Sequence, residues 1–227
     1  MYIKNIFKAT LIAHTHKNII KNHNFINKQI PIKNENMLQY IINNYNIKKL
    51  QLKFALYNWA KYMYVLMDCH TLCIEHVNIP DIHIAKFKKC HTLNISGNNV
   101  TDKSLKKLKY CHTIKLNFTL VTDKCIKYLK NCHKVELFDT NVTDIGIKKL
   151  KKCHTVNIGY TNVTENGIKK LKNCHTIKIA YIKKTNIDVK KLRKYYNIKF
   201  MDNKIEMACL LRISNYAMFN MHGMRIQ

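Results

Sequence analysis

The chain has 227 residues and a formal net charge of +27 at pH 7, with 40 Lys and Arg against 13 Asp and Glu. No stretch approaches the roughly 18 apolar residues of a membrane-spanning helix, and the apolar run at 9–13 is too short for a signal peptide. Nine cysteines, an odd number with six at one repeated position, do not fit a small disulfide-stapled secreted fold. The composition therefore predicts an intracellular, cytoplasmic protein that does not act at a membrane.

The excess of positive charge has two interpretations. A basic surface favours nucleic acid or another acidic partner. A bias toward Lys, Asn, Ile and Tyr, with only 5 Gly and 2 Pro, is also expected from an AT-rich genome that uses Lys in place of Arg. Composition alone leaves both interpretations open.

Residues 1–46 precede the regular part of the sequence. Four aliphatic residues there are spaced as one face of a helix: Met37, Leu38, Ile41 and Ile42. The segment 29–32 around Pro31 predicts a turn into that helix. We expect the helix to cover the open apolar end of the array that follows, with an adaptor role as the alternative.

A Cys-His pair followed by alternating aliphatic residues recurs six times with a fixed period of 21 residues. The pairs begin at Cys69, Cys90, Cys111, Cys132, Cys153 and Cys174. A degraded first unit of 22 residues precedes them, with Ile47, Leu50 and Leu52 at the matching positions. A fixed period of this length indicates a solenoid, in which neighbouring units bury each other's apolar faces.

Each unit has the signals of a strand, a turn and a short helix. Ile114 and Leu116, two residues apart, share one face of a strand, whereas Ile147 and Leu150, three apart, share one face of a helix. A Thr-Asp pair precedes the helices at 101–102, 122–123 and 143–144, with Thr164-Glu165 as the variant, and the Thr hydroxyl can cap the helix. The pattern predicts an α/β solenoid of about eight units of 21–22 residues, with a curved parallel sheet inside and short helices outside.

The C-terminal end departs from the pattern. The unit from Cys174 keeps its strand at Ile177 and Ile179 but has a longer turn, and a last strand is expected at 198–200. Residues 201–227 are rich in Met and contain no repeat. We expect them to be a closing cap or a flexible tail.

The repeated residues resemble the cysteine-containing leucine-rich repeat. The resemblance rests on the pattern C-x-x-[LIV]-x-[LI]-x-x-[NT]-x-V-T-D, with Asn98, Thr119, Thr140 and Thr161 where such repeats carry Asn or a substitute. It implies a leucine-rich repeat solenoid over residues 47–200 that binds another protein through its inner sheet.

The same resemblance implies a second function. Many proteins with such repeats are substrate receptors of ubiquitin ligases, joined to an N-terminal F-box. A degenerate F-box within 1–46, with Ile30-Pro31 as its nearest match, would make ligase scaffold subunits the partners. The repeat sequence is also similar to repeat families of large DNA viruses. That similarity would place the protein in the host cytoplasm.

The Cys-His pairs invite a metal interpretation, since both side chains are zinc ligands. Adjacent side chains of a strand point to opposite faces, however, so the Cys faces the core and the His faces away. The paired CxxC spacing of structural zinc sites is also absent. We therefore expect the six cysteines, Cys69 to Cys174, to form a structural core ladder with no metal and no cofactor.

No glycine-rich phosphate loop or other catalytic signature occurs in the sequence, and nothing singles out one Cys-His pair from the six. A nucleophilic pair would also need a third group to orient it. The sequence therefore predicts a protein that is not an enzyme.

The histidines of the repeat form a second row: His70, His91, His112, His133, His154 and His175. Imidazoles in line repel one another once protonated, so we hypothesise that the array loses stability or changes partner below about pH 6.5. The alternative is that duplication copied one tolerated surface residue six times.

The outward-facing strand positions differ between units, and aromatic residues gather there among charges. Such a composition is typical of the core of a protein-binding surface. The predicted partner-binding residues are Lys115, Phe118, Glu136, Phe138, Asp139, Tyr160 and Tyr181. We therefore predict a scaffold that recognises another protein, of unspecified identity, through the concave sheet.

Nucleic-acid binding is the remaining alternative. A row of lysines along the helical side could follow phosphates while the sheet aromatics stack on bases. The row consists of Lys106, Lys127, Lys148 and Lys169. The acidic Glu136 and Asp139 among the aromatics weigh against this function.

Overall fold

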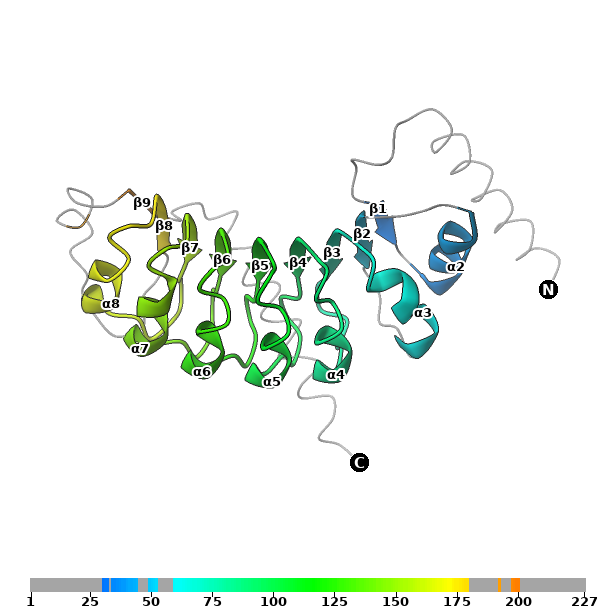
Figure 1. The fold of residues 1–227 in the computed structure, drawn as a ribbon, viewed down its shortest axis with the longest axis horizontal. Helices are drawn as coiled ribbons and strands as arrows, with labels where there is room; N and C mark the ends of the chain where they lie inside the picture. Colours follow the sequence, from blue (N-terminus) through cyan, green and yellow to red (C-terminus); the bar gives the residue numbers. More distant parts are fainter. Residues whose placement is uncertain are drawn as a thin grey trace.

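The computed structural model describes residues 30–32, 34–44, 49–52, 59–179, 192 and 197–200. These residues form a solenoid in which nine parallel strands stack in chain order into one sheet, with short helices on the opposite side (Figure 1). The strands are β1 (Ile30–Ile32), β2 (Lys49–Leu52), β3 (Thr71–Ile74), β4 (Thr92–Asn94), β5 (Thr113–Lys115), β6 (Lys134–Glu136), β7 (Thr155–Asn157), β8 (Thr176–Ile179) and β9 (Ile198–Phe200).

The helices are short because each unit must return to the sheet within 21 residues. They are α2 (Glu35–Asn44), α3 (Trp59–Leu66), α4 (Asp81–Ile84), α5 (Asp102–Leu105), α6 (Asp123–Ile126), α7 (Asp144–Ile147), the 3₁₀ helix η2 (Lys148–Leu150) and α8 (Glu165–Lys169). Within the described ranges, no helix has the length and apolar character needed to cross a membrane.

Equivalent positions of successive units lie side by side in the sheet. Ile114 pairs with Val135, and Val135 pairs with Val156, so the register advances by one whole unit from strand to strand. The degraded first unit keeps the same register, because Leu50 pairs with Leu72. The 21-residue period of the sequence is therefore the period of the stacked strands.

The sheet begins earlier than the sequence predicts. Residues 30–32 form strand β1, parallel to β2, in place of the predicted turn. The Ile-x-Ile alternation suits a strand, and Pro31 is tolerated because β1 is the first strand of the described sheet, where one edge needs no donor. Leu38 and Ile41 of the following helix are buried in the same core as the repeats. This N-terminal strand and helix are continuous with the array.

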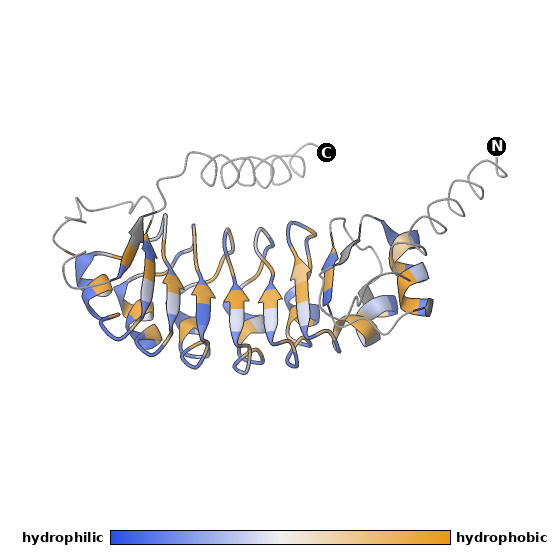
Figure 2. Cartoon of the chain, turned by 90° about the horizontal axis from the view of Figure 1, so that it is seen from above, coloured by the Kyte–Doolittle hydropathy of each residue, from blue (hydrophilic) through white to orange (hydrophobic). Residues whose placement is uncertain are grey.

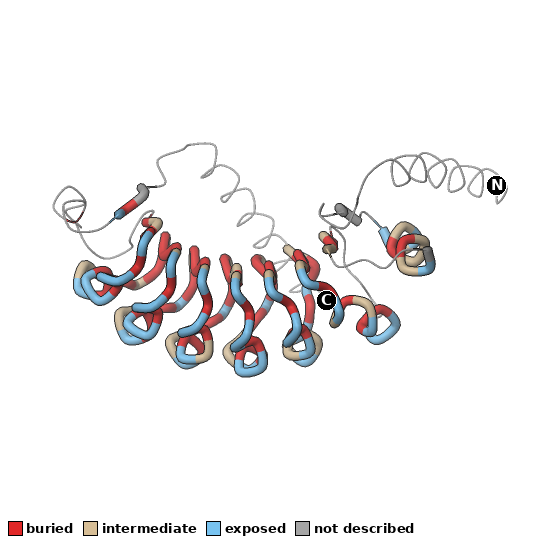
Figure 3. The backbone as a smooth tube through the Cα atoms, turned by 45° about the horizontal axis from the view of Figure 1, so that its top comes forward, coloured by how far each residue is buried: buried red, intermediate tan, exposed pale blue. Residues whose placement is uncertain are grey.

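One apolar core runs through all the units (Figures 2 and 3). The six cysteines of the repeat lie in it, and none is more than 8% exposed. Burial raises the pKa of the thiols of Cys111, Cys132 and Cys153 to about 12. The thiols therefore stay protonated and pack as small apolar groups.

Polar side chains satisfy the backbone where each strand turns away from the sheet. Asn98 is buried and donates to the carbonyls of Ile74 (2.6 Å) and Ile95 (2.9 Å), linking two units. In the next unit the Thr119 hydroxyl donates to the Leu116 carbonyl at 2.6 Å. Thr spans less distance than Asn and bonds only within its own unit, so the later units depend on other contacts for their stacking.

Those contacts come from the residues that begin the helices. Each predicted Thr cap is confirmed: the Thr143 side chain, for example, accepts from the Ile145 amide at 3.2 Å. The same Thr143 is held by Asp123 of the preceding unit, whose carboxylate accepts from the Thr143 amide (2.8 Å) and hydroxyl (2.6 Å). The arrangement recurs for the pairs Asp81–Thr101, Asp102–Thr122 and Asp144–Thr164. We call this series the Asp–Thr ladder.

The ladder explains a glycine inside a helix. A Cβ built on Gly146 would lie 2.3 Å from Asp123 Oδ1 and 3.1 Å from the Asp123 Cα. We expect Gly146→Ala to lower the free energy of unfolding by about 1–3 kcal/mol through this clash, although Ala favours helices over Gly by about 1 kcal/mol. Urea unfolding followed by circular dichroism measures the change.

The control is Ser104→Ala, at the equivalent position of an earlier unit, where a Cβ is already accommodated. It removes one hydrogen bond, from the Ser104 hydroxyl to the Thr101 carbonyl at 3.2 Å, and should cost less than Gly146→Ala. A Gly146→Ala variant as stable as the unchanged protein would contradict the close packing of the ladder.

Candidate partner-binding surface on the inner sheet

The inner face of the sheet is built from the strand residues that alternate with the core. Lys115 lies between the buried Ile114 and Leu116, so its side chain leaves the sheet on the side away from the core. Its neighbours in the stacked strands are Asn94 and Glu136. The surface is therefore a set of rows, each with one residue from every unit.

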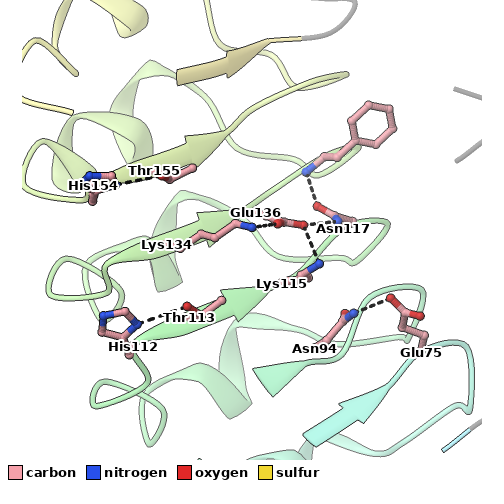
Figure 4. Close-up of polar contacts among 11 residues, drawn as sticks. Glu75, Asn94, His112, Thr113, Lys115, Asn117, Lys134, Glu136, His154 and Thr155 are labelled. Atoms are coloured by element: carbon pink, nitrogen blue, oxygen red, sulfur yellow. Dashed lines mark hydrogen bonds and ion pairs between the residues drawn. The ribbon is translucent and has the colours of Figure 1, made fainter. Parts of the chain in front are cut away.

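An ionic cluster occupies the middle of this surface (Figure 4). The Glu136 carboxylate lies 2.8 Å from the Lys134 ammonium and 3.6 Å from that of Lys115, and it accepts from the Asn117 amide at 3.2 Å. Burial alone would raise the pKa of Glu136, but the two lysines and the Asn117 hydrogen bond outweigh it and lower the pKa. The cluster thus holds a buried negative charge between two partly exposed cations.

An aromatic cluster lies beside it. The Phe138 ring sits between Phe118, at a centroid distance of 5.3 Å, and Tyr160, at 5.0 Å, with tilted planes in both pairs. Tilted rings at these distances have a favourable electrostatic arrangement. The Asn117 side chain joins the two clusters, because its Oδ1 accepts from the Phe138 amide at 2.9 Å and its Nδ2 donates to Glu136.

The backbone of the aromatic cluster is left-handed at two of its three residues. Phe118 has φ +55° and Tyr160 has φ +54°, and the equivalent Asp139 of the unit between them has φ +50°. Gly97 occupies the same position with φ +69°. This conformation costs a side-chain-bearing residue about 1–2 kcal/mol and glycine almost nothing. His76, at the same position of an earlier unit, also has φ +55°, so the left-handed conformation belongs to this turn of the repeat in five successive units and is not confined to Phe118 and Tyr160.

The structure brings most of the predicted partner-binding residues together but buries two of them. Phe138 is only 3% exposed and Glu136 only 8%, whereas the sequence analysis placed both on the open surface. The rings of the two adjacent units flank Phe138, and Glu136 is flanked by Lys115 of the preceding unit and by Lys134 of its own strand. Lys115, Phe118, Asp139 and Tyr160 are half-buried, and Tyr181 lies outside the described residues.

Sequence reasoning missed Lys134 and the linking role of Asn117. Lys134 replaces the Thr that follows Cys-His in the other five units, and this single exception in the repeat was the available signal. The left-handed conformation of Phe118 and Tyr160 had a signal too, because Gly97 stands at the same repeat position.

The histidine row lies at the start of the strands and forms a continuous stack. Ring centroids of successive histidines from His70 to His175 are 4.4–4.7 Å apart, with interplanar angles of 12–15°. The backbone also joins the row, since the His70 carbonyl accepts from the His91 amide at 2.9 Å. All six side chains are exposed, so they cover the edge of the array without entering the core.

The stacked rings also lie close to threonine hydroxyls, and two of the rings have lowered pKa values. His175 Nδ1 lies 3.0 Å from the Thr176 hydroxyl and His154 Nδ1 lies 3.2 Å from that of Thr155 (Figure 4). Desolvation and the charge of neighbouring histidines lower the pKa of His154, and the same two causes lower the pKa of His91. The charge of a protonated ring therefore makes protonation of the next ring less favourable.

Among the described residues, no three or more His, Cys, Asp or Glu side chains are grouped so that they could hold a metal ion. The repeated cysteines are buried and the adjacent histidines are exposed, so the two side chains of a pair lie on opposite sides of the chain. The Cys-His repeat is accordingly explained by packing on one side and ring stacking on the other.

Neither a protein-family model nor a curated protein sequence matches the chain. Among solved structures it is similar to an internalin (inlF) from Listeria monocytogenes, with a TM-score of 0.51, 14% identity, and coverage of 75% of this chain and 51% of that one. It is also similar to an internalin C2 (inlC2) from the same organism, with a TM-score of 0.49, 16% identity, and coverage of 75% and 77%. The chain thus spans about half the length of the first internalin.

At these identities the likeness shows the fold alone. Internalins are leucine-rich repeat proteins, so the predicted α/β leucine-rich repeat solenoid is confirmed. The expected similarities to F-box proteins and to viral repeat families stay predictions.

The histidine stack predicts a pH-dependent stability. Because the folded-state pKa values of His91 and His154 are lowered, the unfolded chain binds more protons as the pH falls through their titration, and stability falls with it. We expect a lower melting temperature near about pH 5.5 than near about pH 7.5, and a flatter dependence in the double variant His91→Gln, His154→Gln.

The control for this experiment is His76→Gln. Burial also lowers the pKa of His76, which is not part of the stack, so this variant measures the contribution of histidine burial elsewhere. Equal melting temperatures at the two pH values, or a double variant with the slope of the unchanged protein, would rule out the stack as a source of pH dependence.

Proposed function

We propose that this protein is a non-enzymatic scaffold that binds a partner protein through the inner sheet of its leucine-rich repeat solenoid. The observation that best supports the proposal is the clustering of Phe118, Phe138 and Tyr160 beside the Lys115–Glu136–Lys134 ion pairs on that face. Aromatic rings beside charged groups are typical of the energetically dominant part of a protein-binding surface.

The chemistry of the surface suggests what a partner presents to it. Phe118 and Tyr160 flank the buried Phe138 ring and offer an apolar contact at the centre. Lys115 and Lys134 stand beside it with about a third of their side chains exposed. We propose a partner segment with an apolar side chain that packs on the aromatic cluster and a carboxylate that reaches the lysines.

The described cysteines are all free thiols, which fits a reducing, intracellular compartment. Adaptor function in a ubiquitin ligase through the N-terminal segment stays a prediction, and recovery of ligase scaffold subunits with the protein would support it.

Replacement of the strained aromatics by glycine separates binding from folding. In the double variant Phe118→Gly, Tyr160→Gly, relief of backbone strain offsets the lost ring contacts, so we expect the free energy of unfolding to change by no more than about 1 kcal/mol. Removal of two anchor residues should weaken binding of a captured partner at least about tenfold.

The experiment is a pull-down with the full chain, followed by titration of each recovered protein against the variants. The matched control is Tyr64→Ala, since Tyr64 is 63% exposed on α3, away from the inner sheet. Partners that bind the double variant as tightly as the unchanged protein would count against the inner sheet as the recognition surface.

A further inference from the structure

The helical side of the solenoid carries a high density of charge, and most of that charge is positive. Each of the later helices ends on an exposed lysine, with Lys106, Lys127 and Lys148 as the C-terminal caps of α5, α6 and α7. More lysines follow in the turn that leads back to the sheet, so residues 143–154 contain four lysines and one carboxylate, Asp144. Figure 3 shows the exposed residues along these outer turns.

The carboxylates of this side are directed into the structure. Asp102, Asp123 and Asp144 are partly buried, and both oxygens of each accept hydrogen bonds from the Thr of the next unit. The Asp–Thr ladder therefore keeps these carboxylates at the junctions between units. These carboxylates therefore do not neutralise the lysines on the outer turns.

One row of lysines is complete across five successive units. It consists of Lys88, Lys109, Lys130, Lys151 and Lys172, all exposed. None of the five forms an ion pair within the described part of the chain, where the ion-paired lysines are Lys61, Lys89, Lys115, Lys134 and Lys169. Because the units are hydrogen-bonded side by side, the row forms a line of unneutralised charge along the solenoid, and we call it the lysine row.

An exposed tyrosine stands beside this row. Tyr110 is 75% exposed, and the Lys109 ammonium lies 4.8 Å from the centre of its ring. Tyr128 of the next unit differs, because it is partly buried against the core and its ring lies 5.1 Å from Lys127, which is outside the row. Exposed aromatic rings beside cations provide stacking positions for bases in single-stranded nucleic acids.

We propose that the lysine row, with Tyr110, binds the phosphate backbone of a single-stranded polynucleotide. Evenly spaced charges in a line match a linear polyanion that carries one phosphate per residue, and a flexible strand can follow the outer curve of the array, where the helices lie (Figure 1). The aromatic cluster of the inner sheet takes no part, because it lies on the opposite face. The proposed polynucleotide site is thus separate from the proposed protein-binding surface.

Fluorescence anisotropy with a labelled uridine oligonucleotide of about 20 residues, at several salt concentrations, tests the proposal. The full chain should bind with an affinity that falls steeply as salt rises. The triple variant Lys109→Gln, Lys130→Gln, Lys151→Gln should bind more weakly and lower the slope of log affinity against log salt by about 2, at about 0.7 per lost phosphate contact.

The matched control removes the same charge from the inner sheet: Lys115→Gln, Lys134→Gln, Lys178→Gln. Melting curves establish that both triple variants are folded. If the control is destabilised by the loss of its Glu136 contacts, the single variants Lys130→Gln and Lys178→Gln are compared, since the lysines that pair with Glu136 are Lys115 and Lys134, and Lys178 lies on β8 opposite Asn157. Phe118→Gly, Tyr160→Gly should bind the oligonucleotide like the unchanged protein.

Three results would overturn the proposal. Equal losses in the two triple variants would show that net charge alone is responsible. An unchanged salt slope in the Lys109, Lys130, Lys151 variant would remove the row from the contact. Tighter binding to vesicles of acidic phospholipid than to the oligonucleotide, with the same dependence on the row, would identify a membrane surface as the ligand.

Discussion

Every feature of this protein depends on the contact between one repeat unit and the next. A single unit has one short strand with unpaired backbone groups and one apolar stripe, and neither is satisfied within the unit. Stacking in register satisfies both: equivalent strand residues pair, and the leucines, isoleucines and cysteines of neighbouring units form one core. The Asp–Thr ladder fixes the same register on the helical side.

Much of this could be predicted from the sequence because it repeats. The period, the strand positions, the Thr caps and the inward direction of Cys132 all follow from spacing that occurs several times in one chain. What could not be predicted occurs once or depends on exact distances. Strand β1 lies outside the period, and the burial of Phe138 and Glu136 depends on how closely the inner-face side chains of adjacent units approach.

The sequence indicated which surface carries the candidate site, but not the exact role of each residue in it. Aromatic and charged residues at varying positions of a constant repeat pointed to the inner sheet, and the structure joins them into two clusters linked by Asn117. The missed residue, Lys134, interrupts the repeat at a position otherwise held by Thr. A residue that departs from a repeat is thus as informative about function as the repeat itself.

The Asp–Thr ladder has a direction. Each unit from α5 to α7 presents a carboxylate to the unit after it and a hydroxyl with an amide to the unit before it, so the two sides of such a unit are complementary to each other. If one whole unit is gained or lost, the carboxylate of one unit again meets the hydroxyl of the next. If a fraction of a unit is gained or lost, these two groups do not meet. Addition or removal of whole units among these would therefore preserve the contact between carboxylate and hydroxyl at the new junction.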